Sequence, residues 1–387
     1  MRDQTNHPHP EGMLSIALLP HGENFNVSIN SGRPLEASRI FEGKTIDETL
    51  HAIPLLFNIC AQAQSVAAVR AVENALACTP GIDVEQKREI LIALEGIREH
   101  LWRILTDWPK LIGQSAEVTT FASFNQSLQL LLALANPDRQ LTVIPGLKKN
   151  RPSFAEDFAT SWFELKYSLL EFLFSDRDFS LQEERFPAHC FVRKLLDGIV
   201  ERGLEKLGDM ALPALPELSF DELHFRLYDR RSASFIARPQ LQGVCYETGP
   251  FARQKFHPLS QDVIRQYGLG AYPRMLARVV DLLQMINTID AQLAGASLFR
   301  SKLPEEPVGL SQLEAVRGRL VHCVGVDRER IDHYRILAPT EWNFHPQGIA
   351  ARMLASLVNQ PQTTLSEQAA FLIQLIDPCV DYQFKFI

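Results

Sequence analysis

Apolar side chains recur at helical spacing over several long segments in the middle of the chain, and this pattern restricts the possible folds more than any other feature. Residues three or four positions apart share one face of an α-helix, so each segment predicts a helix that buries one face. The 46% of hydrophobic and 22% of charged residues are typical of a globular protein. We therefore expect a large helical core, built from residues 84–108, 154–174, 190–207 and 274–293.

Strand patterns lie on both sides of this helical region. Residues 13–19 and 25–29 flank a turn at residues 21–24, and residues 319–326 and 331–337 flank a charged turn at 327–330. Each pair predicts a β-hairpin. Thr45 and Glu48 have the spacing of a capping box before a first helix, which we expect Pro54 to kink or end. Further helices are predicted at residues 58–77, 348–357 and 366–376.

The predicted fold class is therefore α+β and helix-rich. We expect one unit over residues 1–387 without a clear linker. Its parts would be an N-terminal β part (residues 1–45), a helical core (46–300) and a C-terminal α+β part (301–387).

The charge pattern argues against two classes of partner. The formal net charge is -7, and no dense run of Lys and Arg is present, so neither nucleic acid nor an anionic membrane is an expected partner. No segment has the roughly 20 consecutive apolar residues that cross a bilayer, and the first residues lack an apolar signal core. We expect a cytoplasmic protein.

The six cysteines have no paired spacing, which argues against a disulfide framework and a zinc ribbon. Two of them nevertheless stand in notable positions. Cys60 precedes a helix rich in small residues, where the helix dipole favours a thiolate, and Cys379 follows Asp377 and Pro378 near the C-terminus. From position alone, a buried cysteine and a simple turn remain open as interpretations. Packing roles are predicted for the other four, although Cys245 lies close to the Glu247 motif described next: Cys78, Cys190, Cys245 and Cys323.

Five short motifs, in order along the chain, resemble those of the large subunit of nickel-iron hydrogenases. Cys60 and Cys379 match the first cysteine of the family's N-terminal and C-terminal cysteine pairs. Between them, Glu-Thr-Gly-Pro-Phe-Ala-Arg (residues 247–253), Glu-Ala-Val-Arg-Gly-Arg-Leu-Val-His (314–322) and Pro-Thr-Glu-Trp-Asn (339–343) resemble internal family motifs. The resemblance implies the large-subunit fold over essentially the whole chain.

Departures from the family pattern concern the nickel ligands. In the family, four thiolates hold nickel, and two of them bridge to an iron that carries cyanide and carbon monoxide. Ala63 and Tyr382 stand here in place of the second cysteine of each pair, and neither supplies a thiolate. Ala67 and Lys385 stand in place of two family histidines; Lys385 either substitutes for a lost cation or is simply solvated. We therefore expect no nickel and no hydrogenase activity.

Arg317 is retained, and the resemblance implies that its guanidinium points at the cyanide ligands of the iron. Cys60, Cys379 and Arg317 would then form a cradle for an Fe(CN)2(CO) fragment. The other interpretation is that Arg317 pairs with a carboxylate such as Glu314. The loss of both second cysteines is similar to accessory proteins of the HupK and HoxV type.

The expected function is therefore that of a non-enzymatic hydrogenase maturation factor, which holds or carries the iron fragment through Cys60 and Cys379 with Arg317 as donor. Implied partners are maturation proteins, such as a small HypC-like metallochaperone of the iron fragment, and hydrogenase subunits. The alternative is a metal-free mimic of the large subunit that only docks these partners.

Overall fold

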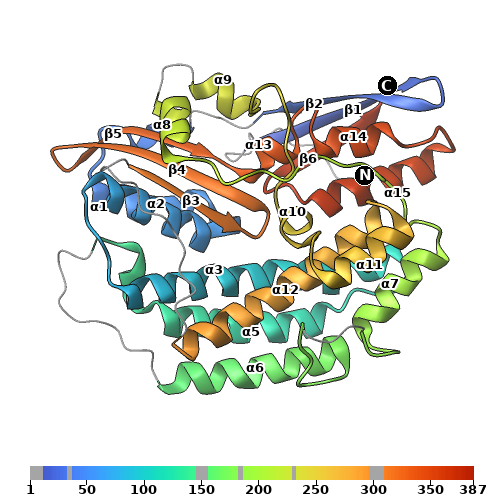
Figure 1. Cartoon of the computed structure of the whole chain (residues 1–387), viewed down its shortest axis with the longest axis horizontal. Helices are drawn as coiled ribbons and strands as arrows, with labels where there is room; N and C mark the ends of the chain where they lie inside the picture. The colour runs from blue at the N-terminus through green and yellow to red at the C-terminus, as the bar shows by residue number, and fades with distance from the viewer. Residues whose placement is uncertain (1–11, 33–36, 145–155, 182–185, 229–231, 296–308) are drawn as a thin grey trace.

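We describe the computed structural model of the chain over residues 12–32, 37–144, 156–181, 186–228, 232–295 and 309–387. Four long helices cross the lower half of the molecule in Figure 1: α3 (Ile82–Trp102), α5 (Val118–Ala135), α6 (Glu156–Phe174) and α12 (Ala271–Leu293). Helix α12 packs on α3, α3 on α5, and α5 on α6. The helix-rich α+β class is thus confirmed.

Shorter helices surround this stack. They are α1 (Ile46–Leu56), α2 (Ala61–Ala75), α4 (Trp108–Leu111), α7 (Phe191–Glu201), α8 (Phe220–Tyr228), α9 (Ser232–Ala237), α10 (Pro250–Gln254), α11 (Pro258–Tyr267), α13 (Pro339–Asn343), α14 (Ile349–Ala355) and α15 (Gln362–Ile376). Single turns of 3-10 helix include η1 (Ala37–Phe41), η2 (Asn58–Cys60) and η4 (Pro137–Thr142).

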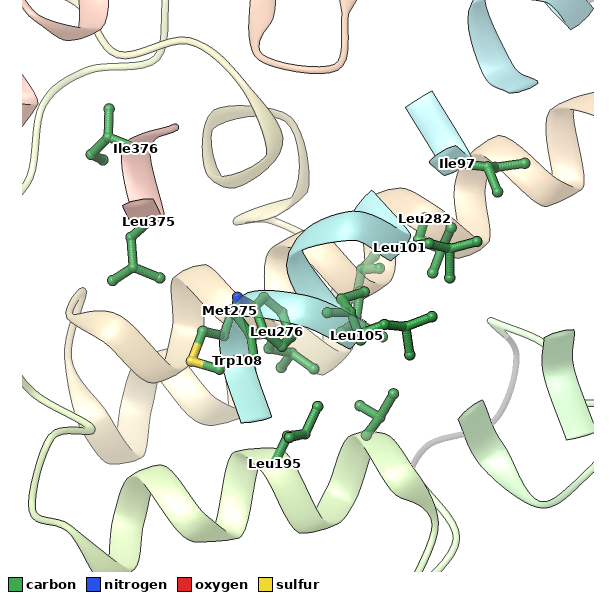
Figure 2. Close-up of a cluster of buried hydrophobic side chains, with 14 of the residues drawn as sticks. Ile97, Leu101, Leu105, Trp108, Leu195, Met275, Leu276, Leu282, Leu375 and Ile376 are labelled. Carbon is green, nitrogen blue, oxygen red and sulfur yellow. The ribbon is translucent and has the colours of Figure 1, made fainter. Parts of the chain in front are cut away.

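The main hydrophobic core lies where α3, α7, α12 and α15 meet. Figure 2 shows labelled side chains of α3, α4, α7 and α12 gathered between these helices, with Leu375 and Ile376 of α15 to one side of them. The side chains of Leu101, Leu105, Met275 and Leu282 are fully buried. Burial of each such side chain contributes roughly 1.5–3 kcal/mol, so this core holds α3 firmly in place. The charged residues on the opposite side of α3 are therefore fixed in space.

Two three-stranded sheets flank the helices. The first has the order β2-β1-β6 and joins the two ends of the chain: β1 (Met13–His21) pairs antiparallel with β2 (Asn24–Ser31) and parallel with β6 (Asp381–Phe386). The second has the order β3-β4-β5, with β3 (Leu310–Ala315), β4 (Gly318–Asp327) and β5 (Arg330–Leu337). Both predicted hairpins are confirmed, whereas β3 and β6 were not predicted. Figure 1 shows the second sheet lying over α1 and α2.

Most predicted helices are found, with different ends. The predicted helix over residues 190–207 stops at Glu201, because Gly203 adopts a φ of 66° and the amide of Leu204 bonds the Ile199 carbonyl. The first helix has its capping box and extends past Pro54 to Leu56.

Two further differences concern the middle of the chain. Helix α5 was not predicted, although Phe124, Leu128, Leu131 and Ala135 recur on one face and are buried. The predicted breaks near residues 145 and 304 lie outside the described residues, as does the predicted start of α6 at Phe154.

Among the described residues, no single helix has the length and apolar composition to cross a membrane. The pair formed by residues 46–56 and 58–75 meets those criteria only when both are taken together, and the two are bent by 96°.

Candidate metal site

Cys60 lies at the end of η2 and is the N-cap residue of α2. Its side chain is partly buried, and the Gln64 side-chain amide one turn later lies 3.6 Å from its sulfur. Ala63 and Ala67, which occupy the positions of the family's second cysteine and histidine, are completely buried. Helix α2 therefore presents one sulfur at this end and closes the neighbouring positions with methyl groups.

Cys379 lies just after α15, at the turn that leads into β6. Asp377 ends the helix in the left-handed conformation, with a φ of 62°, and Pro378 prevents its continuation. The hydroxyl oxygen of Thr340 lies 3.0 Å from the Cys379 sulfur and 3.4 Å from the Cys379 backbone nitrogen. Thr340 belongs to the Pro-Thr-Glu-Trp-Asn motif, so that motif holds the C-terminal cysteine.

Arg317 is placed by a tight turn between β3 and β4, and two internal motifs interlock there. A Cβ on Gly249, which has a φ of 109°, would lie 2.8 Å from the Arg317 carbonyl oxygen. The Asn343 side chain accepts from the Thr248 amide at 3.0 Å and donates to the Thr248 carbonyl at 3.0 Å. Only glycine at position 249 permits the close contact with the Arg317 backbone. The two motifs that contain Gly249 and Asn343 therefore together support the turn that carries Arg317.

The Arg317 guanidinium is buried and binds two acidic groups. Its Nη2 donates to Glu99 at 2.9 Å, and its Nε lies 3.4 Å from an Asp377 oxygen. Glu314 instead pairs with Arg253 and Arg319, so it is not the partner of Arg317. The Nη1 and Nε atoms are buried without a hydrogen-bond partner among the described residues. The guanidinium thus keeps donors that the chain does not use.

Helix α3 contributes charged residues that the sequence analysis missed. Glu95, Glu99 and Arg103 recur every fourth residue, so they share one face of the helix. That spacing of charged residues was the available signal. At Arg103 the helix widens into a π-helical segment, Arg103–Asp107, a distortion that is frequent at functional sites.

Asp377 is the acidic centre of this cluster. It accepts from Arg103 at 2.6 Å and from Arg278 at 3.1 Å, in addition to the contact with Arg317. Burial alone would raise the pKa of Asp377, but the positive charges of Arg317, Arg103 and Arg278 outweigh it and hold the pKa well below its usual range. Asp377 is therefore an anion that gathers three cations beside Cys379.

Cys60, Cys379 and Arg317 lie within electrostatic reach of one another. Burial raises the pKa of the Cys60 thiol; the charge of Cys379 raises it further, whereas Arg317 lowers it. In return, although burial disfavours the Arg317 cation, the charges of Asp377, Glu99 and both cysteines raise the Arg317 pKa. The structure thus brings the three predicted residues to one place.

A cavity of about 380 Å³ opens beside these residues. Its lining comes from η2, α3, the turn before β4, the end of α15 and the start of β6, and includes Ile59, Glu99, Trp102, Arg103, Arg317, Cys379 and Tyr382. Cys60 itself does not line the cavity, but its neighbour Ile59 does. Cys379 and Arg317 therefore line one cavity that is large enough for a small ligand.

Lys385 and the four remaining cysteines, which the sequence analysis also considered, lie outside the cavity lining. The side chain of Lys385 is exposed on β6, which supports a solvated lysine rather than a replaced cation. Cys190, Cys245 and Cys323 are buried in hydrophobic clusters, as predicted, whereas Cys78 is only partly buried. Cys245 is not part of the cavity lining; its sulfur lies 3.3 Å from Nδ1 of His345.

The donor set does not fit a nickel centre. Such a centre needs four thiolates, and Ala63 and Tyr382 supply none. In the described part of the chain, no group of three or more His, Cys, Asp or Glu side chains could hold a metal ion. Cys60 and Cys379 are therefore the two sulfurs that remain at the positions of the family's four nickel thiolates.

Comparisons with known proteins bear on the family and the fold. Residues 265–381 match the family described as nickel-dependent hydrogenase. The chain is 34% identical to the hydrogenase expression/formation protein HupK of Rhodobacter capsulatus, with 95% of each chain covered. It is 29% identical to the hydrogenase expression/formation protein HoxV of Cupriavidus necator, covering 92% of this chain and 91% of that protein.

The fold matches that of solved hydrogenases. The structure of the nickel-iron-selenium hydrogenase of D. vulgaris Hildenborough superposes with a TM-score of 0.69 at 16% identity, covering 93% of this chain and 94% of that one. At this identity the likeness establishes the large-subunit fold alone.

Proposed function

Because the chain belongs to the family of hydrogenase expression/formation proteins that includes HupK and HoxV, we propose that it is a non-catalytic maturation factor that carries the Fe(CN)2(CO) fragment. The fragment is cargo for a nickel-iron hydrogenase large subunit. Cys60 and Cys379 are the sulfur ligands, and Arg317 donates hydrogen bonds to the cyanide nitrogens.

The observation that carries this proposal is the unused donor capacity of Arg317. Its Nη1 is buried and lacks an acceptor among the described residues, and Arg317 lines the same cavity as Cys379. A buried donor without a partner costs about 1–3 kcal/mol, so such a group is retained where a ligand completes it. A cyanide nitrogen on iron is an acceptor, and its negative charge suits a guanidinium.

The number of protein ligands that are available also supports the Fe(CN)2(CO) fragment as cargo. Two thiolates alone are too few for a bare metal ion, but the fragment already carries three strong ligands on iron. Its binding then needs only two protein donors.

A hydrogenase activity is not part of the proposal, because half of the nickel thiolates are replaced. The partners that we propose are a small metallochaperone that delivers the fragment and the hydrogenase large subunit that receives it. The alternative is a metal-free mimic that docks these partners, and it predicts that neither cysteine matters.

Complementation separates these two functions. In a strain that lacks this protein, Cys60→Ala and Cys379→Ala should each lower hydrogen uptake by at least about tenfold, since each removes half of the sulfur ligands. Cys78→Ala is the matched control, because Cys78 is also a free, partly buried cysteine, and it should retain full activity. Full activity of both Cys60→Ala and Cys379→Ala would overturn the carrier role and leave the docking mimic.

A further inference from the structure

A continuous line of hydrogen bonds leads from the Cys60 sulfur into the interior of the protein. Gln64 Nε2 lies 3.6 Å from the sulfur, and Gln64 Oε1 lies 2.9 Å from Nε2 of His322. On the other side of the imidazole, Nδ1 of His322 lies 2.8 Å from the Tyr334 hydroxyl. Gln64 is 2% exposed, and His322 and Tyr334 are completely buried. These side chains come from α2, β4 and β5, so three elements meet behind the site.

The Tyr334 hydroxyl fixes the direction of every bond in this line. Among the described residues, its only hydrogen-bond partner is Nδ1 of His322. A phenol that accepted from His322 would leave its own hydrogen buried without an acceptor, which costs about 1–3 kcal/mol. The hydroxyl therefore donates to Nδ1, and the proton of the neutral ring is on Nε2.

Burial keeps the ring neutral, because it lowers the pKa of His322 to about 3. A neutral imidazole has one donor and one acceptor nitrogen, so Nε2–H must donate to an acceptor. The acceptor is Gln64 Oε1. The amide of Gln64 can then present only its NH2 group to the sulfur of Cys60.

We infer that Gln64 is a positioning residue that aims an N–H donor at the Cys60 sulfur, with its orientation set by Tyr334 through His322. A donor in this place suits a sulfur that accepts, as a metal-bound cysteine does, and holds the side chain of Cys60 in one orientation. The role toward the iron fragment rests on the proposed function, whereas the direction of the hydrogen bonds does not.

The tautomer of His322 is the direct readout. In the full-length chain labelled with ¹⁵N-histidine, long-range ¹H–¹⁵N spectra distinguish Nε2–H from Nδ1–H, and the signal is assigned by its loss in His322→Gln. The expected tautomer at neutral pH is Nε2–H. Tyr334→Phe, which removes only the hydroxyl, should release it to a mixture of tautomers. An Nδ1–H tautomer in the wild type, or an unchanged pure Nε2–H tautomer in Tyr334→Phe, would overturn the inference.

The effect on Cys60 is measured by alkylation of the metal-free chain with iodoacetamide. Gln64→Met keeps an unbranched side chain but has no donor, and it should lower the rate at Cys60 about threefold relative to Cys379 in the same molecule. Gln62→Met is the matched control on the same helix turn and should leave the ratio unchanged. An unchanged ratio in Gln64→Met would show that Gln64 does not act on the sulfur. Neither measurement involves iron, so failure of the carrier role would not be confused with failure of this inference.

Discussion

Two buried arginines each bind an acidic residue of α3: Arg88, which belongs to α3 itself, and Arg317, which lies in the turn between β3 and β4. They differ in how many of their hydrogen-bond donors have a partner. Arg88, which is 0% exposed, donates from Nε to the Leu141 carbonyl at 2.8 Å and from Nη2 to Glu73 at 2.8 Å, while Nη1 donates to Glu73 at 2.7 Å and also to Glu85. Arg317, 6% exposed, uses Nη2 and leaves Nη1 without an acceptor among the described residues. The hydrogen bonds of the Arg88 cluster are complete, whereas the Arg317 cluster has unused donors in a residue that lines a cavity.

This difference separates a structural cluster from a candidate site. A buried charge is stable where all its donors are satisfied, and the Arg88 cluster needs nothing further from outside. The Arg317 cluster has unused donors, and two cysteine sulfurs lie within electrostatic reach of it. Substitutions in the two clusters should therefore separate stability from function.

The largest expected effect on stability comes from Arg88→Met. It would leave Glu73, which is 1% exposed, and Glu85 without their buried cation, and it should reduce the free energy of unfolding by about 3–5 kcal/mol. Chemical denaturation followed by circular dichroism measures this loss. Any variant that still folds should keep the infrared signature of bound fragment, since the cluster has no part in binding.

Arg317→Met should reduce stability only slightly but reduce maturation strongly, the opposite of Arg88→Met. Asp377 would keep Arg103 and Arg278, and Glu99 would keep Arg98, so the loss of stability should be only about 1–2 kcal/mol. Hydrogen uptake in the complemented strain should nevertheless fall by at least about tenfold. If stability falls as much as in Arg88→Met while maturation persists, Arg317 is a structural residue and the comparison fails.

Glu95 is a buried carboxylate without a hydrogen bond from any arginine that the structure describes, and it should make the stability of the protein depend on pH. Glu95 accepts from the backbone amides of Gln62 and Ala63 at 2.7 and 3.0 Å, and burial raises its pKa to about 7. The folded pKa lies above the model-peptide value of about 4.3. Its contribution to stability is therefore complete below about pH 4, and it is lost as the pH rises to about 7.

Glu95→Gln should remove this dependence. Between pH 5 and pH 8 the wild type should lose roughly 2–3 kcal/mol more stability than the variant, as measured by denaturant midpoints at each pH. If stability changes with pH in the same way in both proteins, the pKa of Glu95 is the same in the folded and the unfolded state, and the prediction is wrong.

The smallest expected effect is that of Thr340→Val, which keeps the shape and removes the hydroxyl beside Cys379. Stability should change by less than about 1 kcal/mol, since one partly buried hydrogen bond is lost. The alkylation rate of Cys379 relative to Cys60 should change, as read by mass spectrometry. An unchanged ratio would mean that Thr340 serves only the backbone of Cys379.

The same comparison shows what the sequence could predict. Helical periodicity predicts α3 and α12, and motif order predicts the fold and the three residues of the site. The residues that complete the site, Glu99 and Arg103, were missed because their charges lie inside a segment interpreted as core. The pairing of β6 with β1 is a long-range contact, and no local pattern in the tail reports its partner.

Local sequence patterns also do not predict which group each hydrogen-bond donor binds, or which donor has no acceptor. The spacing of Arg317 and Glu314 suggested a local pair, but the strand register gives Glu314 to Arg319 and turns Arg317 toward Glu99 and Asp377. Only the folded arrangement shows that Nη1 has no partner among the described residues. The unused donor of Arg317 is therefore a finding of the structure.

Infrared spectroscopy tests the central claim most directly. The full-length protein is purified without oxygen from cells that contain the hydrogenase maturation proteins, beside Cys60→Ala, Cys379→Ala and the control Cys78→Ala. We predict cyanide and carbonyl stretching bands, with iron at up to one atom per chain and no stoichiometric nickel, in the wild type and in Cys78→Ala only. Absence of both bands and of iron from the wild type would contradict the carrier function.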